Sequence, residues 1–347
     1  MDKFVNNNSL LKLVFNGSSY RYLEKKSIFV TGSTGFLGKW IIQVLIFLNY
    51  YYNLNLKVYL LVRDKKKSLT FINQIINSKD IFIEYIEGDI RNFKFPTYHI
   101  DHVIHLASNS SEDSIKNYKK TLDIIIKGTN RIYNLSDNLK VSSLTFLSSG
   151  AVYGKHCPDN SGWQEDDLIY HNKETLDNPY AIAKKKAENY LLKNFKSSNN
   201  IRTLNIFRAF SFGGSGFNNK DNYAFNSFIK NRIDNKTVKV NSNGKSKRNY
   251  MHPLDLTNWI LNGFKFQDIN IINTGSTENY SIKKLAEQIA FLKYKNLKKV
   301  GLELGSIGQK ENYIPNTNKA KKMGLKTYIP LKKQIEDSLN YYYNNLL

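Results

Sequence analysis

The fold is decided by one short stretch of the chain, Ser27-Ile28-Phe29-Val30-Thr31-Gly32-Ser33-Thr34-Gly35-Phe36-Leu37-Gly38. An apolar run rich in β-formers ends in a turn that contains three glycines, and a helical pattern of apolar residues follows at once. A second apolar run, Lys57–Val62, completes a strand–helix–strand unit. We therefore predict an α/β fold built on a doubly wound parallel sheet.

Each glycine of this turn has a separate task. Gly32 can adopt the backbone angles of the turn, Gly35 leaves room for a pyrophosphate, and Gly38 lets the helix lie close to the strand. The N–H groups at the start of the helix and the positive end of its dipole then face the phosphates. This context predicts a Rossmann-type dinucleotide site. The cofactor-binding residues that we expect in the turn are Gly32, Thr34, Gly35, Phe36, Leu37 and Gly38.

The composition allows a large core and limits the function classes. The chain has 347 residues, of which 41% are hydrophobic, and a formal net charge of +22. The lysines are scattered along the chain, and no nucleic-acid-binding motif accompanies them, so we expect no specific nucleic-acid partner. A basic surface would still attract a diphosphate substrate.

Neither a membrane span nor a cysteine-based site is expected. No apolar run is long enough to cross a membrane, and the N-terminus lacks a cationic stretch followed by an apolar core. Cys157 is the only cysteine, which rules out an internal disulfide and a cysteine-rich metal site, and we expect no metal. A cytoplasmic protein fits these features best.

A tyrosine and a lysine later in the chain form a candidate proton-exchange pair. Pro179 opens a helical pattern in which Tyr180 and Lys184 are four residues apart, so their side chains lie on one helical face. An ammonium near a phenol favours the phenolate and lowers its pKa. The spacing alone is common in a chain with 23 tyrosines. Because the pair follows the glycine turn in the chain, we interpret it as a proton-exchange pair.

Three motifs together resemble the extended short-chain dehydrogenase/reductase family, which contains nucleotide-sugar epimerases, dehydratases and reductases. They are the Gly-x-x-Gly-x-x-Gly turn, residues 148–154 (Ser-Ser-Gly-Ala-Val-Tyr-Gly), and the Tyr180-x-x-x-Lys184 pair. The resemblance covers nearly the whole chain. It implies an NAD(P)-dependent enzyme with Ser149, Tyr180 and Lys184 as catalytic residues, in which Lys184 also holds the nicotinamide ribose.

The resemblance also implies a cofactor site that extends beyond the turn. It places Asp89 and Ile90 near the adenine, and Leu106, Ala107 and Ser108 on the nicotinamide side. Arg63 follows the second strand directly, where an arginine accepts a 2′-phosphate. We therefore favour NADP over NAD, although Asp64 could bind the ribose instead if the register slips by one residue. We interpret His105 as structural.

On the substrate side, the resemblance implies a nucleotide-diphosphate sugar bound by Ser149, Gly150, Ser211 and Arg248. Arg248 would clamp the diphosphate. Ser211 replaces an asparagine that the family often has there, so that contact differs. Residues 108–111 and 212–222 would shape the sugar site. We interpret His252 as structural and expect Asp255 to cap a helix that begins at Leu256.

The reaction has open alternatives. The sequence around Ser149 and Phe210 is most similar to a branch of 4-keto-sugar reductases related to CDP-abequose synthase, so we expect reduction of a 4-keto nucleotide sugar. An NAD-dependent 4-epimerase needs the same three residues. A 4,6-dehydratase usually has an Asp-Glu pair at the positions of Gly150 and Ala151, which disfavours it. A cofactor-binding regulator without catalysis is the alternative from another class.

The expected organisation has three parts. Residues 1–26 form an N-terminal extension with a short helix, residues 27–210 the dinucleotide-binding domain, and residues 211–347 mainly a substrate-binding lobe. About residues 250–275 return to the first domain. Asn243-Gly244 predicts a hairpin turn. The family resemblance implies a homodimer that uses the long helix near residues 114–135 and the helix after it.

Overall fold

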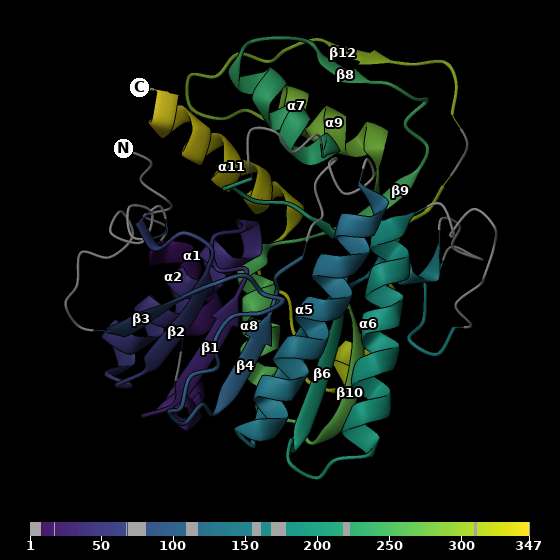
Figure 1. Cartoon of the computed structure of the whole chain (residues 1–347). Coiled ribbons are helices and arrows are strands. Elements are labelled where there is room, and N and C mark those ends of the chain that lie inside the picture. Colours follow the sequence, from purple (N-terminus) through teal and green to yellow (C-terminus); the bar gives the residue numbers. More distant parts are fainter. Residues whose placement is uncertain are drawn as a thin grey trace.

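A parallel sheet forms the body of the molecule. The computed structural model describes residues 8–16, 18–66, 68, 81–108, 117–154, 161–167, 178–217, 223–308 and 311–346. Across these residues, seven strands form one sheet in the spatial order β10-β6-β5-β4-β1-β2-β3. In chain order they are β1 (Ser27–Thr31), β2 (Lys57–Val62), β3 (Phe82–Glu87), β4 (His102–His105), β5 (Ser143–Ser149), β6 (Thr203–Ala209) and β10 (Asp268–Thr274). All neighbours pair in parallel, which confirms the predicted doubly wound sheet (Figure 1).

Helices cover both faces of this sheet because its strands are apolar on both sides. Ile28 and Val30 of β1 pack with α2 (Phe36–Tyr52) and α8 (Pro253–Gly263). Phe29, which points to the other face, packs with α5 (Tyr118–Asn138) and α6 (Pro179–Lys196). The helix predicted near the N-terminus is α1 (Asn8–Phe15), and it joins the α2 and α8 side.

The strand order reverses at β1, which lies between β2 and β4. Val30 is in register with Leu60 on one side and with Ile104 on the other. In open α/β sheets, ligands bind outside the carboxyl ends of the strands at such a reversal. The geometry therefore puts the candidate site at the ends of β1 and β4.

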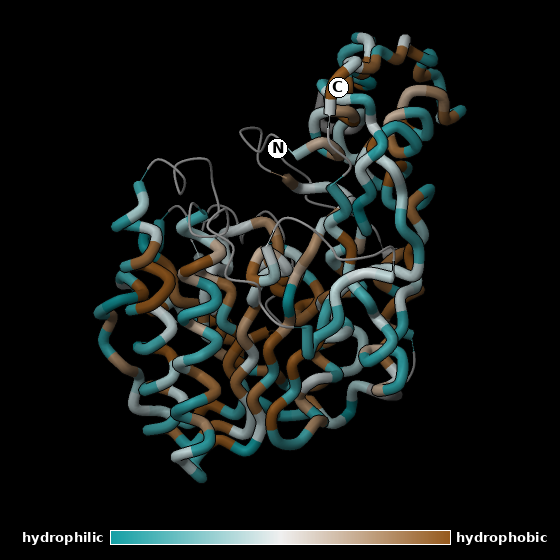
Figure 2. Tube along the Cα trace, turned by 90° about the vertical axis from the view of Figure 1, so that its right-hand side faces the viewer, coloured by the Kyte–Doolittle hydropathy of each residue, from teal (hydrophilic) through white to brown (hydrophobic). Residues whose placement is uncertain are grey.

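A smaller lobe lies above the sheet (Figure 1). In it α7 (Ala224–Ile233), α9 (Ile282–Phe291) and α11 (Leu331–Leu346) pack around a third apolar cluster that includes Phe225 and Leu285. Figure 2 shows the lobe projecting beyond the body, whose inner segments are hydrophobic. The domain boundary near residue 210 stays a prediction.

Short strands connect the lobe to the body. β7 (Ser211–Phe212) pairs with β9 (Lys247–Met251), which also pairs with β11 (Asn279–Ser281). β8 (Val238–Val240) pairs in parallel with β12 (Leu302–Leu304). The remaining short helices are η1 (Ser18–Leu23), η2 (Gly150–Tyr153) and α10 (Asn318–Lys322).

The predicted hairpin at Asn243-Gly244 is wrong. β8 and β9 flank this turn but belong to different sheets. Gly244 has a φ of +69°, as a tight turn requires, but its carbonyl oxygen accepts the N–H of Lys283 at the start of α9. The turn packs on a helix, so the two strands find partners elsewhere.

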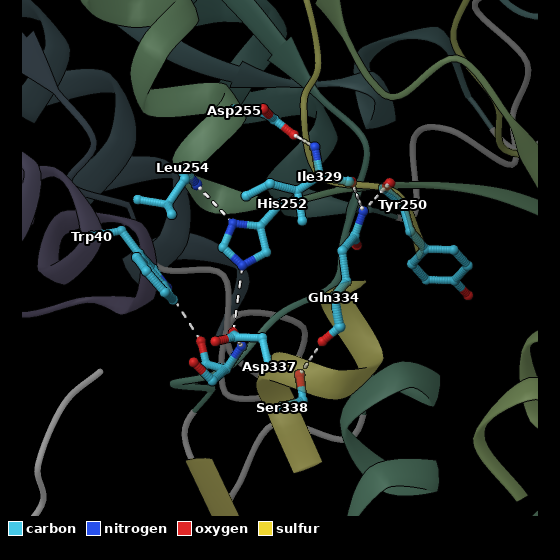
Figure 3. A network of polar contacts seen from close by, with 10 residues as sticks. Trp40, Tyr250, His252, Leu254, Asp255, Ile329, Gln334, Asp337 and Ser338 are labelled. Carbon is cyan, nitrogen blue, oxygen red and sulfur yellow. Dashed lines mark hydrogen bonds and ion pairs between the residues drawn. The ribbon is translucent and has the colours of Figure 1, made fainter. Parts of the chain in front are cut away.

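The predicted cap of α8 is also wrong, by a shift of three residues. The helix begins at Pro253, and its N-cap is His252, whose side chain accepts the N–H of Leu254. The Asp255 carboxylate instead accepts the backbone N–H of Tyr328 and, as Figure 3 shows, that of Ile329. Burial raises the pKa of Asp255 to about 6. His252 is structural, as expected.

Candidate active site at the end of the parallel sheet

The glycine turn after β1 is shaped by close backbone contacts. Gly32 has a φ of +71°, and a Cβ on it would lie 2.8 Å from the backbone nitrogen of Ala107. A Cβ on Gly38 would lie 2.2 Å from the carbonyl oxygen of Gly32. The turn angle and the close helix–strand approach that the sequence predicted are therefore both present.

The start of α2 fits an anionic diphosphate. Gly35 is the N-cap of α2, and as a glycine it has no side chain to accept the N–H groups of the first turn. Thr34 and Gly35 are exposed, while Phe36 and Leu37 are partly buried. Open donors at the positive end of a helix dipole are an anion site. Binding by these residues stays a prediction.

The loop after β4 closes the other side of the turn. The N–H of Leu106 donates to the carbonyl oxygen of Thr31, and the N–H of Ala107 donates to the Thr31 hydroxyl. His105 is buried between the hydroxyls of Thr31 and Thr129, and burial lowers its pKa to about 3. His105 is therefore structural, as predicted. Residues 109–111 lie outside the described part of the chain.

At the predicted adenosine end, Arg63 is exposed directly after β2, and Asp64 beside it is partly buried. The Asp89 carboxylate is bound by a residue that sequence reasoning did not select. Arg91 donates to it through Nε at 2.8 Å and reaches Asp123 on α5 through Nη1 at 2.7 Å. The hydrogen bonds from Arg91 lower the pKa of Asp89.

Ile90, which was predicted to lie near the adenine, is buried against α5. A Cβ on Gly128 of that helix would lie 2.9 Å from Cγ1 of Ile90. The contact with adenine stays a prediction. The basic run after Arg63 is described only in part, since Lys67 and residues 69–80 lie outside the described residues.

The three predicted catalytic residues come together at the ends of β5 and α6. Ser149 is the last residue of β5. The side chain of Asn178 caps α6 by accepting the N–H groups of Tyr180 and Ala181, which fixes the first turn of the helix. Lys184 lies one turn later, with Nζ 5.7 Å from the centroid of the Tyr180 ring.

The pKa values differ from the sequence-based expectation. Burial raises the pKa of Tyr180 above its usual range, the phenols of Tyr313 and Tyr223 raise it further, and hydrogen bonds with Ser149 and Ser108 lower it. The predicted lowering by Lys184 is therefore wrong for this structure.

The physical reason is that Lys184 is buried and bound elsewhere. Its Nζ donates to the carbonyl oxygen of Leu147 at 2.6 Å. Burial lowers the pKa of Lys184 to about 7, and the nearby Glu188 carboxylate opposes that shift. Lys184 thus ties α6 to β5 and is not a fixed charge beside the phenol.

The predicted substrate residues belong to segments that pack near the end of β5, where Ser149 lies. A Cβ on Gly150 would meet the ring of Phe210 at 2.6 Å. Ser211 is partly buried in β7. Arg248 of β9 donates through Nη1 to the carbonyl oxygen of Glu311 at 2.6 Å. This bond holds the guanidinium of Arg248 beside Glu311 and the residues after it. Contacts with substrate stay predictions.

Tyr313 also lies beside Ser149, and sequence reasoning missed it. Its hydroxyl lies 3.5 Å from Ser149 Oγ, and the Arg248 guanidinium lies over its ring. Its backbone is joined to β9, because the N–H of Tyr313 donates to the carbonyl oxygen of Lys247. No local pattern marks residues 311–317, so only the tertiary structure brings this side chain to Ser149.

A buried ion pair lies behind the catalytic strand. Arg208 of β6 donates to Glu188 of α6 at 2.8 Å, and both side chains are almost fully buried. Glu188 also accepts from the hydroxyl of Ser148, and Arg208 donates to the Tyr153 hydroxyl. A glutamate one turn after Lys184 on an otherwise apolar helix face was the pattern that could have revealed it.

The described part of the chain contains neither a cluster of metal ligands nor a membrane-spanning helix. Within the described ranges, no group of three or more His, Cys, Asp or Glu side chains could hold a metal ion. Among the described helices, none is long and apolar enough to cross a membrane.

The sequence model of the NAD dependent epimerase/dehydratase family matches residues 28–275. The chain belongs to that family. The resemblance inferred from the three motifs is thereby confirmed, and so is the prediction of an enzyme, because the NAD dependent epimerase/dehydratase family is a family of enzymes.

Curated relatives within the epimerase/dehydratase family match most of the chain. The UDP-glucuronate 4-epimerase of Thermodesulfobacterium geofontis is 25% identical over 335 residues, which cover 91% of this chain and 96% of that protein. The dTDP-4-dehydro-6-deoxyglucose reductase of Escherichia coli is 25% identical over 280 residues, covering 77% and 82%.

A solved structure supports the fold. The crystal structure of UDP-glucuronic acid 4-epimerase from Bacillus cereus, in complex with UDP-glucuronic acid and NAD, superposes with a TM-score of 0.73. It is 20% identical, and the match covers 92% of this chain and 99% of that one. At this identity the likeness shows the fold alone.

Proposed function

We propose that this enzyme transfers a hydride between a nicotinamide cofactor and C4 of a nucleotide sugar, in the direction that reduces a 4-keto sugar. The observation that carries the proposal is the meeting of Ser149, Tyr180 and Lys184 at the same end of the sheet as the glycine turn, where ligands of such folds bind. A bound nicotinamide cofactor would supply the hydride.

The side chains have distinct roles in this proposal. Tyr180 donates its phenolic proton to the oxygen that develops negative charge at C4. Ser149 donates a hydrogen bond to the same oxygen. Lys184 holds α6 against β5 through Leu147 and also binds the nicotinamide ribose. Partial burial of Tyr180 limits the access of water to the proton transfer.

We propose NADP as the preferred cofactor, on the strength of Arg63. Its side chain is exposed directly after β2, where an arginine can pair with a 2′-phosphate. The family is NAD dependent by name, and the Bacillus cereus structure contains NAD, so NAD is the alternative cofactor.

A 4-epimerase is the second candidate, and one observation favours it. The relative from Thermodesulfobacterium geofontis, which matches along almost its whole length, is a UDP-glucuronate 4-epimerase. A 4,6-dehydratase remains disfavoured, because Gly150 and Ala151 have no group that can exchange a proton. A regulator without catalysis is also disfavoured, since all three catalytic residues are present.

The homodimer is part of the proposal as well. α5 and α6 pack side by side on one face of the sheet (Figure 1), which is the pair of helices that the family resemblance assigns to the interface. We propose a nucleotide-diphosphate sugar as the substrate, and neither a specific nucleic acid nor a membrane as a partner.

One experiment separates the candidates. The protein is purified without added cofactor and denatured, any released nucleotide is identified, and a second portion is titrated with NADPH and NADH. An empty protein that binds NADPH more tightly than NADH supports the reductase. Tightly held NAD in near-stoichiometric amount, with conversion of UDP-glucuronate to its C4 epimer, supports the epimerase. A protein that binds neither cofactor contradicts both.

A further inference from the structure

Asp337 lies on α11 of the lobe, yet its carboxylate is buried where the lobe meets the body. Only 2% of its side chain is exposed. Its Oδ2 accepts the backbone N–H of Ser215 at 3.1 Å and lies 3.4 Å from Nε2 of His252 (Figure 3). A single carboxylate oxygen therefore contacts two segments that are far from α11 in sequence.

A hydrogen bond at Nδ1 fixes the tautomer of His252. Its Nδ1 accepts the N–H of Leu254 at 3.1 Å, so this nitrogen carries no proton. The proton of the neutral ring is then on Nε2, which points at Asp337. His252 thus donates to Asp337 while it caps α8, and both bonds depend on the same ring orientation.

The backbone N–H and the backbone carbonyl oxygen of Ser215 both form hydrogen bonds with side chains. Its N–H donates to Asp337, and its carbonyl oxygen accepts from Nε1 of Trp40 on α2 at 3.2 Å. The flanking Gly214 and Gly216 have φ values of +98° and +88°. A Cβ on Gly214 would also lie 2.8 Å from Nε2 of His252, so the backbone approaches this ring closely.

Phe217, two residues after Ser215, contacts the start of α2. Phe217 stacks on Phe36 with ring centroids 4.0 Å apart and ring planes inclined by 17°. Phe36 is the first residue of α2, and Trp40 lies one turn later on the same helix. Residues 213–217 are therefore fastened to α2 at two points, one of them at the start of the helix next to the glycine turn.

We propose that Asp337 is a positioning residue for the cofactor site: through Ser215 it holds residues 213–217 so that Phe217 stacks on Phe36 at the start of α2. The proposal rests on the proposed function only in assigning the cofactor diphosphate to that helix end. It makes a residue of the C-terminal helix a determinant of cofactor affinity, although its side chain is directed at Ser215 and His252 and not at the glycine turn.

Comparison of Asp337→Ala with the conservative variant Asp337→Asn separates a positioning role of Asp337 from a general effect on stability. Asp337→Ala leaves the buried N–H of Ser215 without this acceptor, which carries a free-energy penalty. Asp337→Asn keeps an oxygen that can accept from both Ser215 and His252. Ser338→Ala is the matched control, because the Ser338 hydroxyl is equally buried but donates only to the Gln334 carbonyl within α11 (Figure 3).

The test measures hydrogen exchange of a peptide covering residues 213–217, together with the dissociation constants of NADPH and NADH. In Asp337→Ala we expect the peptide to exchange about tenfold faster or more and the affinity for the better cofactor to fall about tenfold. Asp337→Asn should resemble the wild type in both readouts, and Ser338→Ala should change neither.

The opposite results overturn the inference. Exchange in Asp337→Ala equal to that in Ser338→Ala, or faster exchange with unchanged cofactor affinity, would contradict it. If Asp337→Ala does not fold, Trp40→Phe, which removes the indole N–H that donates to the Ser215 carbonyl oxygen, decides by the same readouts. A wild-type protein that binds neither cofactor overturns the proposed function, and exchange of the 213–217 peptide then still decides whether Asp337 anchors that segment.

Discussion

Nζ of Lys184 donates to the carbonyl oxygen of Leu147 across 2.6 Å, so the catalytic helix is fastened to the strand that ends in Ser149. Leu147 lies two residues before Ser149 on β5, and Lys184 lies one turn after Tyr180 on α6. The bond therefore sets the position of the phenol relative to the serine. It keeps the amine of Lys184 in a buried place, where the charged form of the amine is unfavourable for stability.

The first prediction follows from that burial. Because the pKa of Lys184 is lowered to about 7 in the folded protein, the unfolded chain binds more protons between about pH 7 and pH 10, and stability rises with pH in that window. Lys184→Met removes the titrating group. We expect it to be more stable than the wild type at pH 7, by about 1 to 4 kcal/mol, with a smaller rise towards pH 10.

Urea unfolding at pH 7 and at pH 10 measures both the higher stability of Lys184→Met at pH 7 and its smaller rise towards pH 10. Lys186→Met, at an exposed position on the same helix, is the matched control and should follow the wild type. Parallel pH dependence of the wild type and Lys184→Met would show that Lys184 is charged in the folded protein throughout this range. Lys184→Met should also lose activity, since the ammonium no longer holds the ribose.

The second prediction concerns the phenol. Tyr180→Phe should lower turnover about 100-fold or more, because the proton donor is lost, while cofactor affinity stays near that of the wild type. Tyr313→Phe removes a different hydroxyl, 3.5 Å from Ser149, and is the matched control with a much smaller effect. Steady-state kinetics and cofactor titration are the measurements. Full turnover in Tyr180→Phe would remove this residue from the mechanism.

The third prediction tests the glycine turn. A Cβ on Gly38 would lie 2.2 Å from the Gly32 carbonyl oxygen, so Gly38→Ala must push α2 away from β1. We expect loss of measurable cofactor binding and a fall in stability of about 1 to 3 kcal/mol. Gly301→Ala, whose nearest neighbour is the Thr237 side chain at 3.1 Å, is the control. Normal NADH and NADPH titrations in Gly38→Ala would argue against diphosphate binding at this turn.

The fourth prediction concerns cofactor choice. Arg63→Ala should weaken NADPH binding about tenfold or more and leave NADH binding unchanged, because only NADPH carries the 2′-phosphate. Lys57→Ala, at the exposed first position of β2, the strand that Arg63 follows, should change neither affinity. Fluorescence titrations at constant ionic strength measure both constants. Equal losses for the two cofactors would assign Arg63 to a contact that they share.

Local patterns predicted the elements of the body, because each depends on neighbours in sequence. The turn at Gly32 to Gly38 and the pair Tyr180 and Lys184 are of this kind: the spacing of a few residues fixes the geometry. The wrong hairpin at Asn243-Gly244 shows the limit. Whether a turn joins paired strands depends on partners such as β12, which follows about 60 residues later in the chain.

The electrostatics of the site depended on burial, which the sequence does not reveal. A lysine four residues from a tyrosine predicts a lowered phenol pKa only if the ammonium faces the phenol. In the folded chain, Lys184 faces Leu147, and desolvation dominates the titration of both groups. Tyr313 and Asp337 escaped prediction for a related reason, since their roles arise from contacts with residues more than 100 positions away.

The last prediction concerns the ion pair between Glu188 and Arg208 behind the catalytic strand. Both side chains are at most 4% exposed, so Glu188→Gln leaves the Arg208 guanidinium buried without its counter-charge. We expect the free energy of unfolding to fall by about 3 to 5 kcal/mol, since breaking one partner of a buried pair is strongly destabilising. Glu287→Gln, which removes a carboxylate 3.9 Å from Lys283 on the surface of α9, should change it by about 1 kcal/mol or less. Urea unfolding at pH 7 compares the two variants. Equal stabilities would mean that Arg208 finds sufficient partners in the Tyr153 hydroxyl and the Glu165 carbonyl oxygen, which also accept from it.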